Sequence, residues 1–249
     1  MQEEDKKKKR KHRPSVAIGL WVIKRIEKFL MLFSDFPDRP FLKAADFAWT
    51  VELESNWLEV RKELDHILEN PEKIPNFQDI SKDQTNLTKD EHWKSFFLFG
   101  YGYKFDSNCD LCPQTTKLLE SIPGMFTAFF SILSPGKHIP RHRGPYKGLL
   151  RGHLGLIVPE SRQDCWIQVG EETATWEEGK SMVFDDTYKH QVQNNTGETR
   201  VVLFIDVIRP LRFPGSLVNK LVLQLIRMSP FIQDARRNQM AWEKRLGED

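Results

Sequence analysis

Cysteine is scarce in this chain: only three of its 249 residues are cysteines, at positions 109, 112 and 165. This small, odd number argues against a disulfide framework and favours a reducing compartment. An excess of one charge sign is also missing, since 37 basic residues stand against 35 acidic ones. With 39% hydrophobic and 11% aromatic residues, the sequence is that of a globular protein with one main domain.

The charge that is present gathers near the N-terminus. Lys6 to Lys11 form an unbroken basic run, and residues 1–14 are predicted to be a disordered basic tail. Residues 15–34 follow as an amphipathic segment that lacks the roughly 20 apolar residues of a membrane-spanning helix. This segment fits a helix in a membrane interface, and packing of the same helix on the domain is the alternative. No secretory signal with a cleavage site is visible. We expect an anionic membrane surface, and no nucleic acid, as a partner.

The remaining residues divide by their hydrophobic periodicity. Residues 35–92 predict a helical lead-in and a polar loop, because apolar residues recur every three or four positions from Trp49 to Leu68. From residue 93 to 210, short β-like runs separated by turn residues predict a mainly β sandwich or jelly roll. The runs are Phe96–Phe99, Phe126–Leu133, His153–Val158, Trp166–Val169, Ser181–Phe184, Gln191–Gln193 and Arg200–Val207. Residues 211–249 predict a C-terminal helical extension, with an amphipathic helix at 217–228.

Histidines among these strands are candidate metal ligands. His190 begins one predicted strand and Arg200 the next, with a turn around Asn195 between them. A hairpin centred on that turn would make His190 and Arg200 cross-strand partners on one face. A guanidinium beside a metal ligand can hold the far carboxylate of a chelating co-substrate such as 2-oxoglutarate. Fe(II) oxygenases of this class usually add a carboxylate ligand. Its expected position, two residues after His142, is Gly144, and either Asp185 or Asp186 is a candidate replacement.

Four stretches carry motifs at matched spacing: Ser134–Pro145 (SPGKHIPRHRGP), Arg151–Pro159 (RGHLGLIVP), Trp176–Lys180 (WEEGK) and Phe184–His190 (FDDTYKH). Together they resemble the aspartyl/asparaginyl β-hydroxylases, a family of Fe(II)- and 2-oxoglutarate-dependent dioxygenases. In character the chain is most similar to the bacterial branch that hydroxylates acyl chains of lipid A or ornithine lipids. The resemblance covers roughly residues 93–210. It implies a double-stranded β-helix, a cupin-like jelly roll, with flanking N- and C-terminal helices.

The resemblance also implies site residues and cofactors. In that family two histidines alone hold the iron, with glycine where the carboxylate would be, which matches His142, His190 and Gly144. Arg200 matches the cation that binds the distal carboxylate of the co-substrate 2-oxoglutarate. Four further residues are implied to line the same site: Ser131, Trp93, Arg151 and His153.

The expected substrate follows from two departures from the peptide-hydroxylating branch. In that branch an arginine two residues before the position of Arg151 binds the substrate carboxylate, and here that position is Leu149. A second such arginine would fall near Thr88. Because a buried carboxylate needs a paired cation, we expect a lipid acyl chain as substrate, at the cytoplasmic face of the inner membrane. Hydroxylation of peptides or a free amino acid is the alternative. An inactive β-helix module that binds a lipid or a partner is the alternative from another class.

Overall fold

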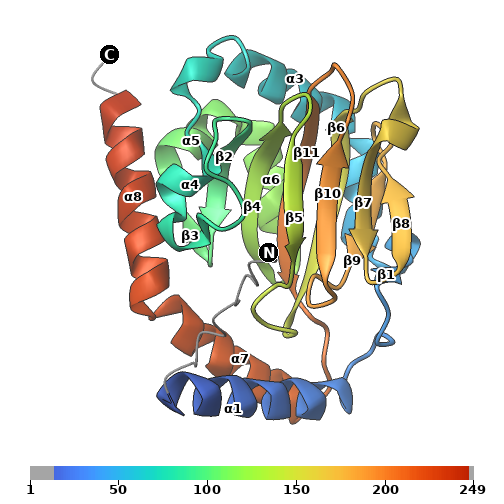
Figure 1. Ribbon diagram of the computed structural model, residues 1–249, viewed down its shortest axis with the longest axis vertical. Coiled ribbons are helices and arrows are strands. Elements are labelled where there is room, and N and C mark those ends of the chain that lie inside the picture. Colours follow the sequence, from blue (N-terminus) through green and yellow to red (C-terminus); the bar gives the residue numbers. More distant parts are fainter. Residues whose placement is uncertain (1–13, 247–249) are drawn as a thin grey trace, which may run out of the picture.

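Two antiparallel β-sheets face each other in the computed structural model, which describes residues 14–246 (Figure 1). The larger sheet has the strand order β1-β9-β6-β11-β4-β2-β3 and the smaller one the order β5-β10-β7-β8. The larger sheet contains β1 (Phe41–Leu42), β2 (Trp93–Gly100), β3 (Tyr103–Lys104), β4 (Met125–Leu133), β6 (Leu149–Ile157), β9 (Ser181–Phe184) and β11 (Arg200–Ile208). The smaller sheet contains β5 (His138–His142), β7 (Cys165–Val169), β8 (Glu172–Thr175) and β10 (His190–Asn194).

The chain passes back and forth between the two sheets from β4 to β11. This alternation makes the pair of sheets a double-stranded β-helix and confirms the predicted jelly roll. All seven predicted runs fall on strands, although Val158 lies just past the end of β6. Strands β1, β3, β5 and β8 were not predicted. β1 comes from the segment expected to be a lead-in, and it pairs with β9 at the edge of the larger sheet.

Strand β4 shows why the larger sheet sits at the centre. Phe129 and Leu133 point between the two sheets, where they join one apolar cluster. Phe130 and Ile132 point to the opposite face and join a second cluster with residues of the covering helices. A continuous apolar run of this kind is typical of a strand that is buried on both faces.

Helices cover the larger sheet and one end of the molecule. They are α1 (Pro14–Met31), α2 (Ala48–Ser55), α3 (Trp57–Ile67), α4 (Phe77–Ile80), α5 (Asp106–Leu111), α6 (Pro113–Ser121), α7 (Gly215–Arg227) and α8 (Pro230–Leu246), with short 3-10 turns between some of them. The helix predicted over residues 49–68 is divided at Asn56 into α2 and α3. Cys109 lies in α5, and all three cysteines are buried free thiols.

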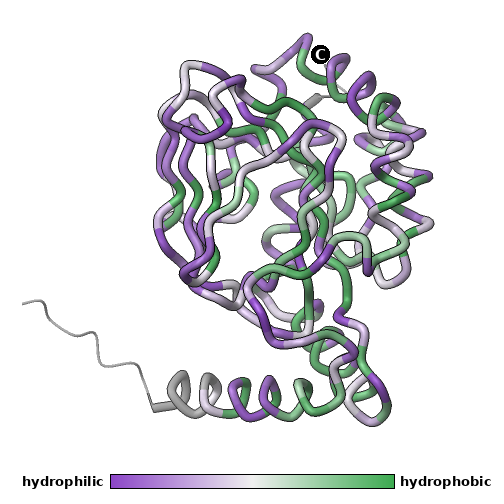
Figure 2. Tube along the Cα trace, turned by 90° about the vertical axis from the view of Figure 1, so that its right-hand side faces the viewer, coloured by the Kyte–Doolittle hydropathy of each residue, from purple (hydrophilic) through white to green (hydrophobic). Residues whose placement is uncertain are grey.

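Helices α1 and α7 lie side by side beyond one end of the sheets (Figures 1 and 2). Leu30 of α1 and Leu223 of α7 are buried together with Phe126 of β4 in a third apolar cluster. A Cβ atom on Gly215 would lie 2.7 Å from Phe33, so the absence of a side chain permits this close approach. The amphipathic N-terminal segment therefore packs on the protein, yet Trp21 remains 59% exposed.

Two predictions about the N-terminus have different outcomes. The basic tail predicted for residues 1–14 lies, apart from Pro14, outside the described residues. Within residues 14–246, no helix is both long enough and apolar enough to cross a bilayer, as the charges in α1 led us to expect.

Candidate metal and co-substrate site

His142 and His190 stand opposite each other where β5 ends and β10 begins. Their ring centroids lie 4.1 Å apart. The Nδ1 atom of His142 lies 2.8 Å from the carbonyl oxygen of Pro140, and that of His190 lies 2.9 Å from the carbonyl oxygen of Tyr188. A carbonyl can only accept, so each ring carries its hydrogen on Nδ1 and keeps the lone pair of Nε2 available. Metal-binding imidazoles are commonly oriented in this way.

Both rings are held in their neutral form. Burial lowers the pKa of His142, and burial together with the neighbouring His142 lowers the pKa of His190 to about 3. Because a neutral imidazole is the form that binds a metal ion, protons do not compete for this pair near neutral pH.

Gly144 explains why the usual third ligand has no room at its usual position. A Cβ atom built on Gly144 would overlap the carboxylate of Asp186. The backbone nitrogen of Gly144 also donates to the carbonyl oxygen of Asp186 at 2.8 Å. In the described part of the chain, no three His, Cys, Asp or Glu side chains gather closely enough to hold a metal ion together. Neither Asp185 nor Asp186 therefore completes a three-residue ligand set.

Asp185 stabilises the fold rather than binding a metal ion. Its carboxylate is buried and receives hydrogen bonds from the backbone and hydroxyl of Thr187. It also forms ion pairs with Arg209 and, at 3.1 Å, with Lys147. This network fixes the turn between β9 and β10, from which His190 follows.

Arg200 is a buried cation without a carboxylate partner among the described residues. Its side chain is about 1% exposed, and its Nε atom has no hydrogen-bond partner. Nη1 donates a long hydrogen bond of 3.4 Å to the carbonyl oxygen of Ser131, and the ring of Trp176 lies 4.6 Å from Cζ. The buried thiol of Cys165 also contacts the guanidinium. Burial lowers the pKa of Arg200 to about 10, so it stays charged at neutral pH. An unpaired buried charge of this kind fits an anionic ligand.

The predicted hairpin between His190 and Arg200 is wrong. β10 pairs with β5 and β7 in the smaller sheet, whereas β11 pairs with β4 and β6 in the larger one. The turn around Asn195 therefore crosses from one sheet to the other. Arg200 faces Leu133 of β4 in register, and its side chain enters the space between the sheets from the side opposite His190.

Ser131 and Trp93 lie beside Arg200. The indole Nε1 of Trp93 donates to the hydroxyl oxygen of Ser131 at 3.1 Å, and both side chains are buried. Phe77 stacks on the Trp93 ring with centroids 3.9 Å apart. The structure therefore brings Ser131, Trp93 and Arg200 together, as the resemblance implies.

His153 joins the arginine side of the site to the histidine pair. Its Nδ1 accepts a hydrogen bond of 3.3 Å from Nε1 of Trp176, so the ring hydrogen is on Nε2, which is buried without a partner. Burial, and then the charge of Arg200, hold the pKa of His153 well below its usual range. A neutral donor therefore points into the interior with nothing to accept from it. Trp176, which contacts both Arg200 and His153, belongs to a quoted motif but was not predicted as a site residue.

Arg151 is fully engaged by two carboxylates. Its Nε lies 2.9 Å from Asp206, its cross-strand neighbour on β11, and its Nη2 lies 2.9 Å from Asp186. These carboxylates raise the pKa of Arg151, while burial raises the pKa of Asp186 to about 6. Sequence reasoning missed Asp206. Its signal is the period of two along β11, which places Asp206 on the same face as Arg200.

A cavity of about 490 Å³ of empty space reaches His142 and Arg151. Its remaining walls are mainly aromatic and apolar, from Phe77, Leu87, Trp93, Phe97, Tyr101, Phe129 and Phe204. Leu149 does not line it: this residue packs in the cluster beneath α1 and α7. Thr88 is also elsewhere, since its hydroxyl accepts a hydrogen bond of 2.9 Å from Lys137.

The residues fit the implied metal and co-substrate. Two neutral imidazoles present free Nε2 lone pairs, and two orphaned groups, Nε of Arg200 and Nε2 of His153, suit an anion with several oxygens. Arg151 is excluded as the main anion partner because Asp186 and Asp206 already hold it.

The chain is similar to known proteins of one family. Residues 54–210 match the family described as aspartyl/asparaginyl beta-hydroxylase. The ornithine lipid ester-linked acyl 2-hydroxylase of Rhizobium tropici is 42% identical over 94% of this chain and 84% of its own length. The human aspartyl/asparaginyl beta-hydroxylase is 33% identical over 64% of this chain, which corresponds to only 21% of the human protein.

Among solved structures, the cupin domain of Schizosaccharomyces pombe Cnp3 aligns with 12% identity over 56% of this chain and 77% of that chain. The TM-score is 0.35, so the fold assignment rests on the strand topology rather than on this likeness. The match over residues 54–210 and the extended similarity to two hydroxylases settle the family. The chain belongs to the aspartyl/asparaginyl β-hydroxylase family.

Proposed function

We propose that the protein is an Fe(II)- and 2-oxoglutarate-dependent dioxygenase that hydroxylates a lipid acyl chain. One observation carries the dioxygenase assignment: a pair of neutral histidines with free Nε2 atoms lies in the same interior as a buried, unpaired guanidinium, that of Arg200. When bound, Fe(II) and 2-oxoglutarate would supply the oxygen chemistry that no protein side chain provides.

The residues of the chain have distinct roles in this proposal. His142 and His190 hold the metal ion through Nε2. Arg200 would hold the distal carboxylate of 2-oxoglutarate, assisted by the hydroxyl of Ser131, which accepts a hydrogen bond of 3.1 Å from Trp93. His153 donates its Nε2 hydrogen to an oxygen of the co-substrate. The surrounding aromatic rings exclude water from the reacting groups.

The cavity supports an acyl chain as substrate. Its walls are mainly apolar, and Arg151, the one permanent cation among its described lining residues, is neutralised by Asp186 and Asp206. A substrate carboxylate would therefore find no free cation there. Each methylene of an acyl chain gains about 0.8 kcal/mol on burial, so a long chain can be held without ionic contacts. The name of the Rhizobium tropici relative points to an ornithine lipid.

The two helices at the end of the molecule support binding to a membrane surface. Leu217, Leu221 and Leu225 recur at intervals of four on α7 and are 49%, 54% and 68% exposed. Phe213 precedes α7 in the chain and is 77% exposed. Leu32 follows α1 and is 71% exposed, and its neighbour Phe33 accepts a hydrogen bond from the backbone of Arg212. We define Leu32, Phe213, Leu217, Leu221, Leu225 and Met228 as the apolar platform. It lies at the end of the sheets where α1 and α7 pack, and a helix face of this kind inserts shallowly into a bilayer. We place it at the cytoplasmic face of the inner membrane.

Purified protein provides the test. With Fe(II), 2-oxoglutarate and ornithine lipid in neutral detergent, we expect succinate and a lipid heavier by one oxygen atom in equal amounts. Chelation of the metal ion should stop both products. Turnover that persists after complete iron removal would falsify the dioxygenase assignment. Hydroxylation of an aspartate-containing peptide but not of the lipid would show that the substrate is a peptide rather than a lipid.

A further inference from the structure

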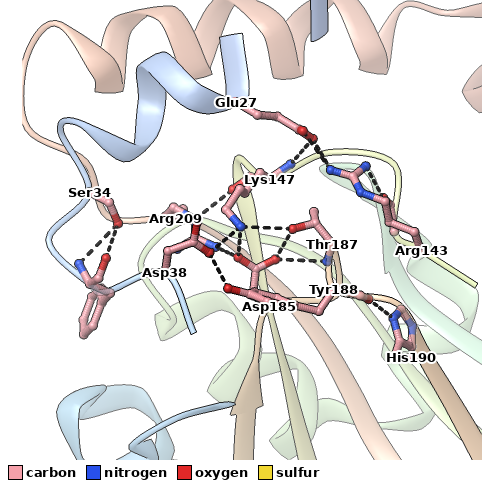
Figure 3. Close-up of polar contacts among 12 residues, drawn as sticks. Glu27, Ser34, Asp38, Arg143, Lys147, Asp185, Thr187, Tyr188, His190 and Arg209 are labelled. Atoms are coloured by element: carbon pink, nitrogen blue, oxygen red, sulfur yellow. Dashed lines mark hydrogen bonds and ion pairs between the residues drawn. The ribbon is translucent and has the colours of Figure 1, made fainter. Parts of the chain in front are cut away.

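A charged cleft lies between α1 and the loops that lead to the two iron-ligand candidates (Figure 3). It is open to solvent, contains about 900 Å³ of empty space and shares no lining residue with the apolar cavity. Lys24 and Lys28 of α1 form one wall, and Arg143, Lys147 and Tyr188 form the other. Lys24, Lys28 and Arg143 have no role in the site described above, whereas Lys147 pairs with Asp185 and the carbonyl oxygen of Tyr188 orients His190.

The wall nearest the site is fixed by ion pairs. Glu27 of α1 is buried, and its two carboxylate oxygens each lie 2.8 Å from Nη2 of Arg143. The same carboxylate accepts from the backbone nitrogen of Lys147 at 3.1 Å. Lys147 Nζ lies 2.6 Å from Asp38, which also accepts from the hydroxyl of Tyr188 at 2.8 Å. The cleft is therefore a built site rather than a gap between loose side chains.

The charges of the cleft do not balance. Four cations and two carboxylates line it, so two positive charges are in excess. Glu27 and Asp38 are engaged with Arg143 and Lys147, whereas Lys24 and Lys28 are exposed and pair with no carboxylate among the described residues. A carboxylate or phosphate group is the ligand that two free ammonium groups attract.

The cleft lies next to the two histidines of the proposed iron site. His142 lines the apolar cavity and the next residue, Arg143, lines the cleft. In the turn before β10, Tyr188 lines the cleft while its carbonyl oxygen orients His190. A lipid joins an apolar chain to a charged head group through a few bonds, so the two spaces suit its two parts.

We propose that the cleft binds the carboxylate in the head group of the lipid substrate through Lys24 and Lys28. This inference rests on the proposed function, because it assumes that an acyl chain enters the neighbouring cavity. It assigns α1 to substrate recognition in addition to packing against α7.

The test is a pair of charge reversals on the same end of the molecule. K24E/K28E changes the cleft, and R25E/K220E makes the same change of charge on exposed residues of α1 and α7 outside the cleft. In neutral detergent micelles with ornithine lipid, K24E/K28E should raise the KM for lipid about tenfold or more, with a much smaller effect on kcat. R25E/K220E should change KM less than about twofold, although it alters long-range attraction as much as K24E/K28E does. K24R/K28R keeps both charges and should behave like wild type.

Binding of the protein to micelles that contain ornithine lipid can be measured without oxygen, so that no hydroxylation takes place. This measurement tests the head-group site independently of the proposed function. Loss of binding in K24E/K28E alone supports the head-group site even if wild-type protein does not hydroxylate the lipid. Equal losses in both double variants, or none in K24E/K28E, would overturn it and leave lipid hydroxylation standing. Wild-type protein that neither binds nor hydroxylates the lipid would contradict both.

Discussion

The rings of His142 and His190 lie 4.1 Å apart, and each is oriented by the carbonyl oxygen two residues earlier in its own chain segment. The same local arrangement thus occurs twice, once at the end of β5 and once at the start of β10. It places two neutral imidazoles with free Nε2 atoms at one end of the jelly roll. This pair is the centre of the proposed iron site.

Replacing either histidine should remove the metal. His142→Ala and His190→Ala should each lower bound Fe(II) to near zero and abolish succinate formation, because a single imidazole cannot hold the ion. His138, on the same strand β5, supplies the matched control: it is exposed and contacts only Gln191 at 3.3 Å. His138→Ala should keep full metal content by elemental analysis. Metal retained in both single variants of the pair would contradict the site.

Two buried arginines provide a sharper contrast. Arg209 is bound to Asp185, whereas Arg200 has no carboxylate partner among the described residues. Arg209→Met should lower the free energy of unfolding by about 3 kcal/mol, since it removes one of the two cations that pair with the buried carboxylate of Asp185. Arg200→Met should leave the metal-free protein as stable as wild type or more stable, because it removes an uncompensated buried charge. It should instead weaken 2-oxoglutarate binding by about 2–3 kcal/mol.

Urea unfolding and 2-oxoglutarate titration measure the two effects of these arginine substitutions. If Arg200→Met lost as much stability as Arg209→Met and bound 2-oxoglutarate normally, Arg200 would be a structural residue rather than a co-substrate partner.

The sequence predicted much of the fold because the strands of the jelly roll are apolar on the buried faces. The run Phe126–Leu133 was recognised for this reason and became β4. Strand β5 was not predicted, because its five residues HIPRH include a proline and three basic residues. Its pairing with β10 depends on long-range contacts that no local pattern reveals.

The error on the hairpin has a similar cause. The spacing of His190 and Arg200 around the turn predicted that they are cross-strand partners in one hairpin. A turn of the same length can instead connect a strand of one sheet to a strand of the other. Only the global topology decides between the two. The partners of Arg151 were hidden for the same reason, since Asp186 precedes β10 and Asp206 lies on β11, far apart in sequence. The motif resemblance found the site residues, while the structure supplied their contacts.

Gly144 offers a prediction about the missing third ligand. Gly144→Asp would restore the usual residue type, yet its side chain would displace the Asp186 carboxylate, which binds Arg151. We expect this variant to lose hydroxylation at least about tenfold rather than gain metal affinity. Gly197→Ala is the control, because nothing lies within 4 Å of its Cβ position. Tighter iron binding with full activity in Gly144→Asp would show that a carboxylate can be accommodated there.

The apolar platform predicts where the protein meets the membrane. Leu221→Glu with Leu225→Glu should shift the protein from anionic vesicles to the soluble fraction in a sedimentation assay, because charged residues oppose insertion. The matched control is Val51→Glu with Leu58→Glu, since these residues of α2 and α3 are equally exposed at 57% and 64%. Similar vesicle binding by wild-type protein and both double variants would place the contact elsewhere. Deletion of residues 1–33 is a poorer test, because it removes Glu27, which holds Arg143 next to His142.

The substrate is the central claim, and a competition measures it most directly. Wild-type protein is incubated with Fe(II), 2-oxoglutarate, ornithine lipid and an aspartate-containing peptide in one reaction. The masses of the lipid and of the peptide are then measured by mass spectrometry. Because the described cavity walls are largely aromatic and Arg151 is already paired, we predict that the lipid gains one oxygen atom on an acyl chain while the peptide mass is unchanged. A peptide that gains oxygen beside an unchanged lipid would contradict the account and make the protein a peptide hydroxylase.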